Sequence, residues 1–311
     1  MNIIVTGGCG YKGHILIPKL LDKGYNVKVV DTEWFGNFLK PHKNLSFEKI
    51  DVRNVSKNLF CNTDVVIHLA AVANDPCSEL DPKLSWEVGS LSTMQIADYS
   101  AKSGVKQFIY ASSGSVYGVK DEDKVTEDLD LDPISEYNKN KMVSERVLLS
   151  YQDQMLIQII RPATVCGLSP RMRLDVAVNL LTMQALTKNK ITVLGGEQTR
   201  PNIHIDDITD IYLFFIDNPN YCGIFNAGFE NISIMNIANL INDRLNVPID
   251  ILPSNDPRSY RIDSSKLLNL GYKPKKTVEY AIDEIIDAFK KNKLKDEDKY
   301  YNLKWMQAKV L

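Results

Sequence analysis

The feature that most constrains the fold of this chain is a glycine-rich turn directly after its first apolar segment. Residues 2–6 have the pattern of a short buried strand, and residues 14–21 have the pattern of a helix. Gly7, Gly10 and Gly13 lie between them. Glycine there permits a tight turn, close approach of backbone N–H groups to a pyrophosphate, and close packing of the helix on the strand. The order strand, glycine turn, helix therefore predicts a dinucleotide-binding α/β unit.

The second apolar run carries information about the cofactor. Residues 25–30 have strand character and are followed directly by Asp31. A carboxylate at this position can accept the hydroxyl groups of the adenosine ribose and repels a 2′-phosphate. We therefore expect NAD, in preference to NADP.

Further apolar runs alternate with helical stretches, which is typical of a parallel sheet covered on both faces. These runs are residues 65–70, 107–111 and 158–161. Ligands of doubly wound sheets bind at the carboxyl ends of the strands. The pattern loosens after about residue 167. We expect a nucleotide-binding domain over 1–167, with a return of the chain near 203–230, and a smaller lobe mainly over 168–311.

Composition restricts the partners and the location. The chain has 311 residues, 44% of them hydrophobic, and a net charge of −2, so nothing in its charge favours nucleic acid or an anionic membrane. It has no apolar stretch long enough to span a membrane, and a strand pattern that begins at Met1 leaves no room for a signal peptide, so we expect a cytoplasmic protein. The five scattered cysteines and four histidines indicate neither a disulfide framework nor a metal site.

Three side chains suggest chemistry. Tyr137 and Lys141 stand four residues apart in a helical stretch, so they share one face. A free phenol has a pKa of roughly 10, and a fixed cation nearby brings it towards the working range of a base. With Ser113 they supply the hydroxyl, phenol and ammonium that move a proton while a nicotinamide moves a hydride.

Seven ordered motifs extend this pattern over nearly the whole chain. They are Gly7-x2-Gly10-x2-Gly13, Asp51-Val52-Arg53, His68-Leu69-Ala70-Ala71, Ser112-Ser113-Gly114-Ser115-Val116-Tyr117-Gly118, Tyr137-x3-Lys141, Arg161-Pro162 and Arg200-Pro201-Asn202-Ile203-His204-Ile205-Asp206-Asp207. The set resembles the extended short-chain dehydrogenase/reductases of the NAD-dependent epimerase/dehydratase family, which act on nucleotide sugars. The resemblance implies a Rossmann domain with a smaller carboxyl-terminal substrate-binding α/β lobe, and a homodimer or higher homo-oligomer paired through helices near 86–103 and 136–152.

The resemblance also assigns roles. It implies that Tyr137 is the catalytic base, that Lys141 holds the nicotinamide ribose and tunes Tyr137, and that Ser113 bonds the reacting sugar oxygen. The residues implied to hold NAD are Gly7, Gly10, Tyr11, Lys12, Gly13, Asp31, Asp51, Val52, Leu69, Ala70 and Ala71. Candidates for binding the nucleotide sugar are Thr164, Arg171, Arg173, Arg200 and Arg258. The four arginines are candidates because a guanidinium fork suits phosphate oxygens.

Several of these residues have simpler interpretations. Asp51 could be a surface turn acid, and Arg200 could pair with a neighbouring carboxylate instead of a diphosphate. His68 is best interpreted as a core histidine with a backbone partner, and Tyr117 as a packing residue.

Departures from the family pattern bear on the reaction. The 4,6-dehydratases of the family carry an Asp-Glu pair where this chain has Gly114-Ser115, so the proton carriers for eliminating water are missing. Gly89 stands where an Asn is common, Thr164 where many relatives have Asn, and Cys166 where Tyr is usual. The first two changes concern substrate placement.

The main interpretation is an NAD-dependent oxidation of a ring hydroxyl, at C4, of a nucleotide-activated sugar to a keto sugar. A resemblance to capsule-type enzymes acting on GDP-activated heptoses favours release of that product. Two alternatives stay open: a 4-epimerase of the UDP-hexose type that uses the same three residues, and a non-catalytic NAD-sensing regulator.

Overall fold

The computed structural model describes residues 1–254 and 259–309. Within them the chain divides into two compact units. The first consists of Met1–Val116, Pro133–Arg161 and Thr209–Phe225, and the second of Tyr117–Asp132, Pro162–Ile208 and the residues described from Asn226 onward. Each unit is therefore built from segments far apart in the sequence.

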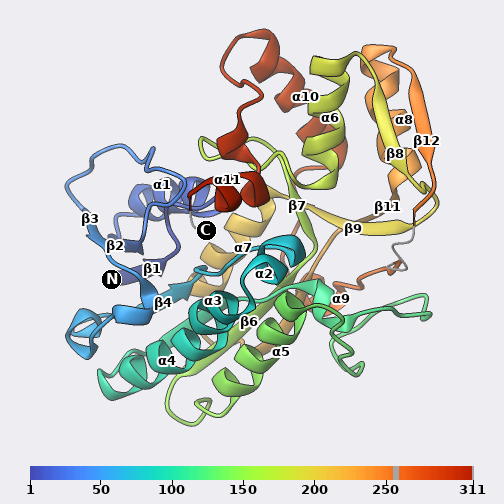
Figure 1. The fold of residues 1–311 in the computed structure, drawn as a ribbon. Coiled ribbons are helices and arrows are strands. Elements are labelled where there is room, and N and C mark those ends of the chain that lie inside the picture. Colours follow the sequence, from blue (N-terminus) through green and yellow to red (C-terminus); the bar gives the residue numbers. More distant parts are fainter. Residues whose placement is uncertain (255–258, 310–311) are drawn as a thin grey trace. The chain divides into compact units, whose positions relative to one another are not determined.

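The first unit is organised around a seven-stranded sheet (Figure 1). Its spatial order is β3 (Leu45–Lys49), β2 (Asn26–Asp31), β1 (Asn2–Thr6), β4 (Val65–His68), β5 (Gln107–Ala111), β6 (Leu156–Pro162) and β10 (Gly223–Ala227). The registers from β3 through β6 are all parallel. Strand order reverses beside β1, so the predicted doubly wound Rossmann sheet is confirmed, with its switch point next to the glycine turn.

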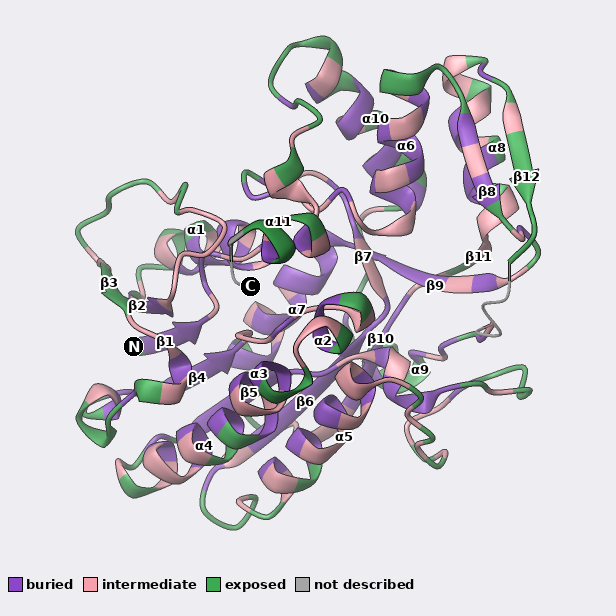
Figure 2. Cartoon of the chain, viewed as in Figure 1, coloured by how far each residue is buried: buried purple, intermediate pink, exposed green. Residues whose placement is uncertain are grey.

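Apolar sequence explains which strands occupy the centre. Every residue of β4 and β5 is buried, whereas most of β3 at the edge is exposed (Figure 2). Strands buried on both faces are expected to be mainly apolar, and β4 and β5 are, apart from His68 at the end of β4 and Gln107 at the start of β5. Because β1, β4 and β5 are parallel neighbours, their carboxyl ends lie side by side at one edge of the sheet.

Helices cover both faces of this sheet (Figure 1). On one side α1 (Gly13–Asp22) is tied to α7 (Ile205–Asp217) by Lys19, whose Nζ lies 2.8 Å from Asp210 Oδ1. The other group consists of α2 (Asp75–Leu80), α3 (Pro82–Trp86), the π-helix η3 (Glu87–Leu91), α4 (Ser92–Lys102) and α5 (Glu136–Leu149). Short 3-10 segments η1 (Val52–Asn54), η2 (Lys57–Phe60) and η4 (Gly114–Tyr117) complete the unit.

The second unit has two small sheets. One has the order β11 (Glu230–Ser233), β9 (Thr199–His204), β7 (Thr164–Cys166), and the other pairs β12 (Ile249–Leu252) with β8 (Ile191–Leu194). The remaining elements are α6 (Ala177–Lys188), α8 (Ile234–Leu245), α9 (Ser265–Asn269), α10 (Val278–Lys290), η5 (Asp298–Tyr300) and α11 (Asn302–Lys309). Apolar side chains of α6, α8 and α10 form one buried core with β8. Across the described ranges, no helix is both long and apolar enough to cross a membrane.

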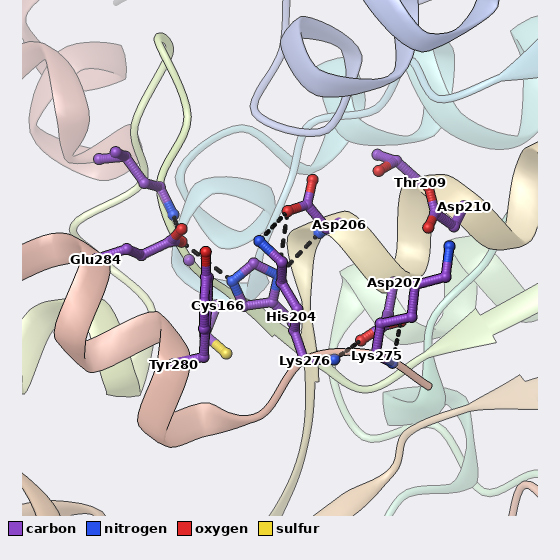
Figure 3. A network of polar contacts seen from close by, with 12 residues as sticks. Cys166, His204, Asp206, Asp207, Thr209, Asp210, Lys275, Lys276, Tyr280 and Glu284 are labelled. Atoms are coloured by element: carbon purple, nitrogen blue, oxygen red, sulfur yellow. Dashed lines mark hydrogen bonds and ion pairs between the residues drawn. The ribbon is translucent and has the colours of Figure 1, made fainter. Parts of the chain in front are cut away.

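Residues at the end of β9 and the start of α7 bond α10 and the segment that precedes it (Figure 3). His204 Nε2 lies 3.1 Å from Glu284 Oε1 of α10, and its Nδ1 accepts a hydrogen bond from the Asp206 N–H. The buried Asp207 carboxylate accepts the backbone N–H groups of Lys275 and Lys276 and the hydroxyl of Tyr272. His204 and Asp207 of the motif Arg200–Asp207 therefore stabilise the fold of the second unit.

Candidate active site

The glycine turn forms a cradle that larger residues would fill. Gly7 has φ +70°, and a Cβ added to it would lie 2.6 Å from the Ala70 nitrogen. A Cβ on Gly13 would lie 2.1 Å from the carbonyl oxygen of Gly8. Both positions need glycine, because neither neighbour is a side chain that can move away. The turn thus keeps its backbone N–H groups at the start of α1, which fits a dinucleotide pyrophosphate.

Asp31 is fixed at the end of β2 beside this turn. Its Oδ2 accepts the N–H of Cys9 at 2.9 Å, and its Oδ1 accepts the N–H of Glu33 at 2.7 Å. The two bonds orient the carboxylate towards the glycine turn. This is the arrangement expected of an acid that receives ribose hydroxyl groups.

The other predicted NAD residues lie after neighbouring strands or in the glycine turn before α1. Leu69, Ala70 and Ala71 directly follow β4, Tyr11 is buried in the turn, and Lys12 Nζ lies 3.4 Å from the hydroxyl of Tyr212. Val52 is buried at the start of η1. These positions agree with an NAD site, and their individual roles stay predictions.

Asp51 is more than a surface turn acid. Burial alone would raise the pKa of its carboxyl, but hydrogen bonds from the side chain and backbone of Arg53 outweigh burial, and the pKa is lowered. Arg53 also bonds Glu87, at 2.6 Å. Asp51 therefore stays charged and holds Arg53, which in turn links η1 to Glu87 of η3.

Lys141 and Tyr137 lie on one face of α5, as their spacing predicts. Ser135 caps this helix by accepting the Asn138 N–H. Lys141 is buried, donates from Nζ to the carbonyl oxygen of Ala111 at 2.7 Å, and lies 5.9 Å from the centre of the Tyr137 ring. Burial, reinforced by the charge of Lys12 and opposed by Glu145, lowers the pKa of Lys141 to about 7.

Ser113 belongs to a hydrogen-bond chain that the sequence did not reveal. Ser115 Oγ donates to Asn138 Oδ1 at 2.5 Å, so it accepts the hydroxyl proton of Ser113, whose Oγ is 2.7 Å away. Ser115 occupies one of the two positions at which the dehydratases carry an acid. A hydroxyl there anchors Ser113 to α5 instead of supplying a proton carrier.

His68 is a core histidine, and its partners are threonine side chains where a backbone partner was expected. Thr93 Oγ1 donates to the Gly89 carbonyl and lies 3.0 Å from His68 Nε2, so Nε2 carries the proton. Thr6 Oγ1 donates to Nδ1 at 2.5 Å. Burial, with a smaller effect of the Lys141 charge, lowers the pKa of His68 to about 3, so the ring stays neutral.

The Arg161 motif forms a buried ion pair. Two guanidinium nitrogens bond both carboxylate oxygens of Glu145, at 3.0 and 2.7 Å, and Ser112 bonds the same carboxylate. Glu145 stands one helical turn after Lys141. The pair therefore holds α5, the helix of Tyr137 and Lys141, to the ends of β5 and β6, a role that the motif itself did not indicate.

The predicted substrate residues lie in the second unit. Arg171 is buried, with its Nη atoms bonded to the Met172 carbonyl and to Asn302. Arg173 pairs with Asp175 at 3.0 Å, and half-buried Arg200 lies 3.4 Å from the Thr199 carbonyl. Thr164 begins β7, and Arg258 lies outside the described residues.

Cys166, for which the sequence offered no explanation, is a core residue of the second unit. It is paired with His204 in the β7–β9 register and belongs to the apolar core of that unit. Among the residues described, no three His, Cys, Asp or Glu side chains gather to form a metal site.

Three features define the class of this protein. They are the glycine turn beside the switch point of the sheet, the hydrogen-bonded Asp31 at the end of β2, and the set Ser113, Tyr137 and Lys141. Together they are typical of an NAD-dependent enzyme of the extended short-chain dehydrogenase/reductase class. Comparison with known proteins agrees. The model of the NAD dependent epimerase/dehydratase family matches residues 3–228, and the chain belongs to this family.

Relatives are similar over nearly the full length of the chain. A putative UDP-glucose 4-epimerase of Methanocaldococcus jannaschii is 27% identical, over 93% of this chain and 99% of that protein. The UDP-glucuronic acid 4-epimerase of Bacillus cereus, solved with UDP-glucuronic acid and NAD, is 28% identical with a TM-score of 0.82, covering 94% of this chain and all of that one. The UDP-glucose 4-epimerase of Thermotoga maritima, solved with UDP-glucose, is 25% identical with a TM-score of 0.84, covering 94% and 99%.

Proposed function

We propose that this protein is an NAD-dependent 4-epimerase of a UDP-activated sugar. The observation that carries the proposal is the set Ser113, Tyr137 and Lys141, with hydroxyl and glycine in place of the two acids of a dehydratase. The similar proteins named as 4-epimerases support this alternative over release of a keto sugar. The GDP-heptose substrate is unconfirmed.

The residues divide the work as follows. Tyr137 accepts the proton of the C4 hydroxyl. Ser113 turns its hydroxyl proton from Ser115 to the same oxygen when the sugar is bound, and keeps that oxygen in place. In its protonated form, Lys141 favours the phenolate form of Tyr137 through space. When bound, NAD supplies the acceptor of the C4 hydride and later its donor. Tyr137 then returns the proton to the 4-keto sugar after its other face has turned towards the cofactor.

The second unit supplies the candidates for holding the nucleotide sugar. Arg200 and Arg173 suit diphosphate oxygens because a guanidinium offers two parallel donors. Thr164 can bond the sugar through its hydroxyl. Arg171, which is buried, would act through Met172 and Asn302.

The decisive experiment is a panel of UDP-, GDP- and dTDP-sugars incubated with the purified enzyme and NAD. We expect a UDP-sugar to give a product of unchanged mass whose C4 configuration is inverted in the NMR spectrum, with no accumulation of NADH. Matched incubations with Tyr137→Phe control for non-enzymatic change.

Other products would overturn the proposal in distinct ways. Stoichiometric NADH together with a released 4-keto sugar would restore the dehydrogenase interpretation. A 4-keto-6-deoxy sugar would show that an acid substitutes for the missing pair. NAD binding without turnover of any sugar would favour a regulator.

A further inference from the structure

The π-helix η3 presents a glycine to the catalytic helix. A Cβ added to Gly89 would lie 2.3 Å from Oδ1 and 2.5 Å from Nδ2 of Asn140. No real Cβ approaches an atom so closely, so Asn140 occupies the space that a side chain at position 89 would take. Asn140 stands between Tyr137 and Lys141 in α5 and is almost fully buried.

The amide of Asn140 is hydrogen-bonded on both sides. Nδ2 donates to the carbonyl oxygen of Ser85 at 2.5 Å, and Oδ1 accepts the hydroxyl of Ser90 at 2.5 Å. The carbonyl oxygen of Asn140 accepts Ser144 Oγ at 2.9 Å. These partners lie at the end of α3, in η3 and in α5. One buried amide thus bonds the residues on both sides of Gly89.

The same glycine completes a second chain of hydrogen bonds. The wider turn of a π-helix displaces carbonyl groups from the regular helical ladder. The Gly89 carbonyl accepts the hydroxyl of Thr93, which accepts the proton of His68 Nε2, and His68 accepts Thr6 at the end of β1. Gly89 therefore lies between the strand that precedes the glycine turn and the helix that carries Tyr137 and Lys141.

We propose that Gly89 and Asn140 are a matched pair that positions the catalytic helix: the Asn140 amide bonds Ser85 and Ser90 on the two sides of position 89, and glycine at that position is required to admit it. The pair is a positioning device, because neither residue touches the reacting atoms. This inference rests on the proposed function of Tyr137 but not on the identity of the sugar.

The mechanical reason is proximity in the helix. Asn140 is one turn after Tyr137 and adjacent to Lys141. The two hydrogen bonds of its side-chain amide therefore fix the rotation of α5 about its axis at the level of both residues. A misplacement of about 1 Å in a catalytic group can lower the rate by roughly a hundredfold.

The test is an exchange of the two side chains. Asn140→Ala removes the amide, Gly89→Asn inserts a second one into occupied space, and Gly89→Asn with Asn140→Ala moves the amide to the other helix. The first readout is the titration of Tyr137 in the NAD complex, measured as the ultraviolet difference spectrum against Tyr137→Phe. It needs no sugar, so it can fail independently of the proposed function.

We expect each single variant to raise the titration midpoint of Tyr137 and, with an accepted sugar, to lower kcat about tenfold to a hundredfold at unchanged KM. The exchange variant should recover both to within a few-fold. Asn242→Ala, which removes a hydrogen bond to the Val247 N–H in the second unit, is the control: it should lower the melting temperature without moving the Tyr137 titration.

Two results would overturn the pairing. One is a Tyr137 titration in Asn140→Ala that matches the parent protein. The other is an exchange variant no better than the worse single variant. If Asn140→Ala does not fold, Asn140→Ser and the exchange variant carry the same comparison.

Discussion

Tyr137 is the residue whose removal should separate chemistry from cofactor binding. Replacing Tyr137 by Phe leaves its ring, which faces the Lys141 ammonium, and removes only the phenolic oxygen. We expect NAD affinity to stay within a few-fold while turnover falls roughly a hundredfold or more, the usual scale for a positioned acid–base group. Calorimetric NAD titration and a product assay measure the two effects. A variant that retains most of its activity would exclude Tyr137 from the mechanism.

Asp31 should determine the choice between the two nicotinamide cofactors. Its carboxylate is oriented by Cys9 and Glu33, so Asp31→Ala removes both the ribose contact and the repulsion of a 2′-phosphate. We expect weaker NAD binding and a lower NAD-to-NADP preference. Glu48→Ala, which removes an exposed acid from the adjacent strand β3, is the charge-matched control. Unchanged discrimination in Asp31→Ala would contradict the assignment.

Lys141 should make stability depend on pH. Its pKa in the folded protein is about 7, against 10.5 for an ordinary lysine in water. Between these pH values the unfolded chain therefore binds a proton that the folded chain does not. The free energy of unfolding without NAD should therefore rise as pH increases through this window and fall as pH decreases through it. Urea titrations of the parent protein and of Lys141→Met measure the difference. Parallel pH curves for the two would contradict the pKa shift.

At the scale of elements, Asp207 holds the segment before α10 to the start of α7. Its carboxylate accepts two backbone N–H groups and one hydroxyl while fully buried. Asp207→Asn places an NH2 group against a donor, and we expect a loss of roughly 2 to 3 kcal/mol in the free energy of unfolding. Asp206→Asn is the control, because its half-exposed ion pair with Lys276 should contribute no more than about 1 kcal/mol. Equal effects of the two variants on chemical denaturation would contradict this role.

Elements with a strong local pattern were predictable, and contacts across the fold were not. The glycine turn, the buried runs of β4 and β5 and the face shared by Tyr137 and Lys141 follow from short sequence windows, and the structure confirms them. The bonds from Ser115 to Asn138 and from Arg161 to Glu145 join segments that only the tertiary fold brings together.

The contact between Gly89 and Asn140 is a second example of a tertiary contact that the sequence alone did not reveal. The family pattern has Asn where this chain has Gly89, but a glycine in one helix does not reveal that an amide from another helix occupies the space. Asn140 is one of the three variable residues between Tyr137 and Lys141. A polar residue beside a catalytic lysine, together with an unexpected glycine elsewhere, is the signal that could have found the pair.

For the whole molecule, the surface of α4 suggests how copies of the chain associate. Leu91, the last residue of η3, is 54% exposed, and Met94 of α4 is 48% exposed, although both are large apolar residues. The helices α4 and α5 pack against each other, and these two side chains stay exposed. Apolar side chains exposed together commonly mark an interface, and a four-helix contact between two copies would cover them.

We therefore predict a homodimer at micromolar concentration, with α4 and α5 of each copy at the interface. Met94→Glu should shift the protein towards the monomer, because pairing would bury a carboxylate without a partner. Light scattering measures the mass of both forms. Leu268→Glu, which changes an exposed apolar residue of α9 in the second unit, is the matched control and should leave the dimer intact. Because the glycine turn, Asp31 and the proposed catalytic residues all lie within the first unit of one copy, a monomeric Met94→Glu variant should still bind NAD. A parent protein that is monomeric, or a Met94→Glu variant that remains dimeric, would contradict the proposed interface.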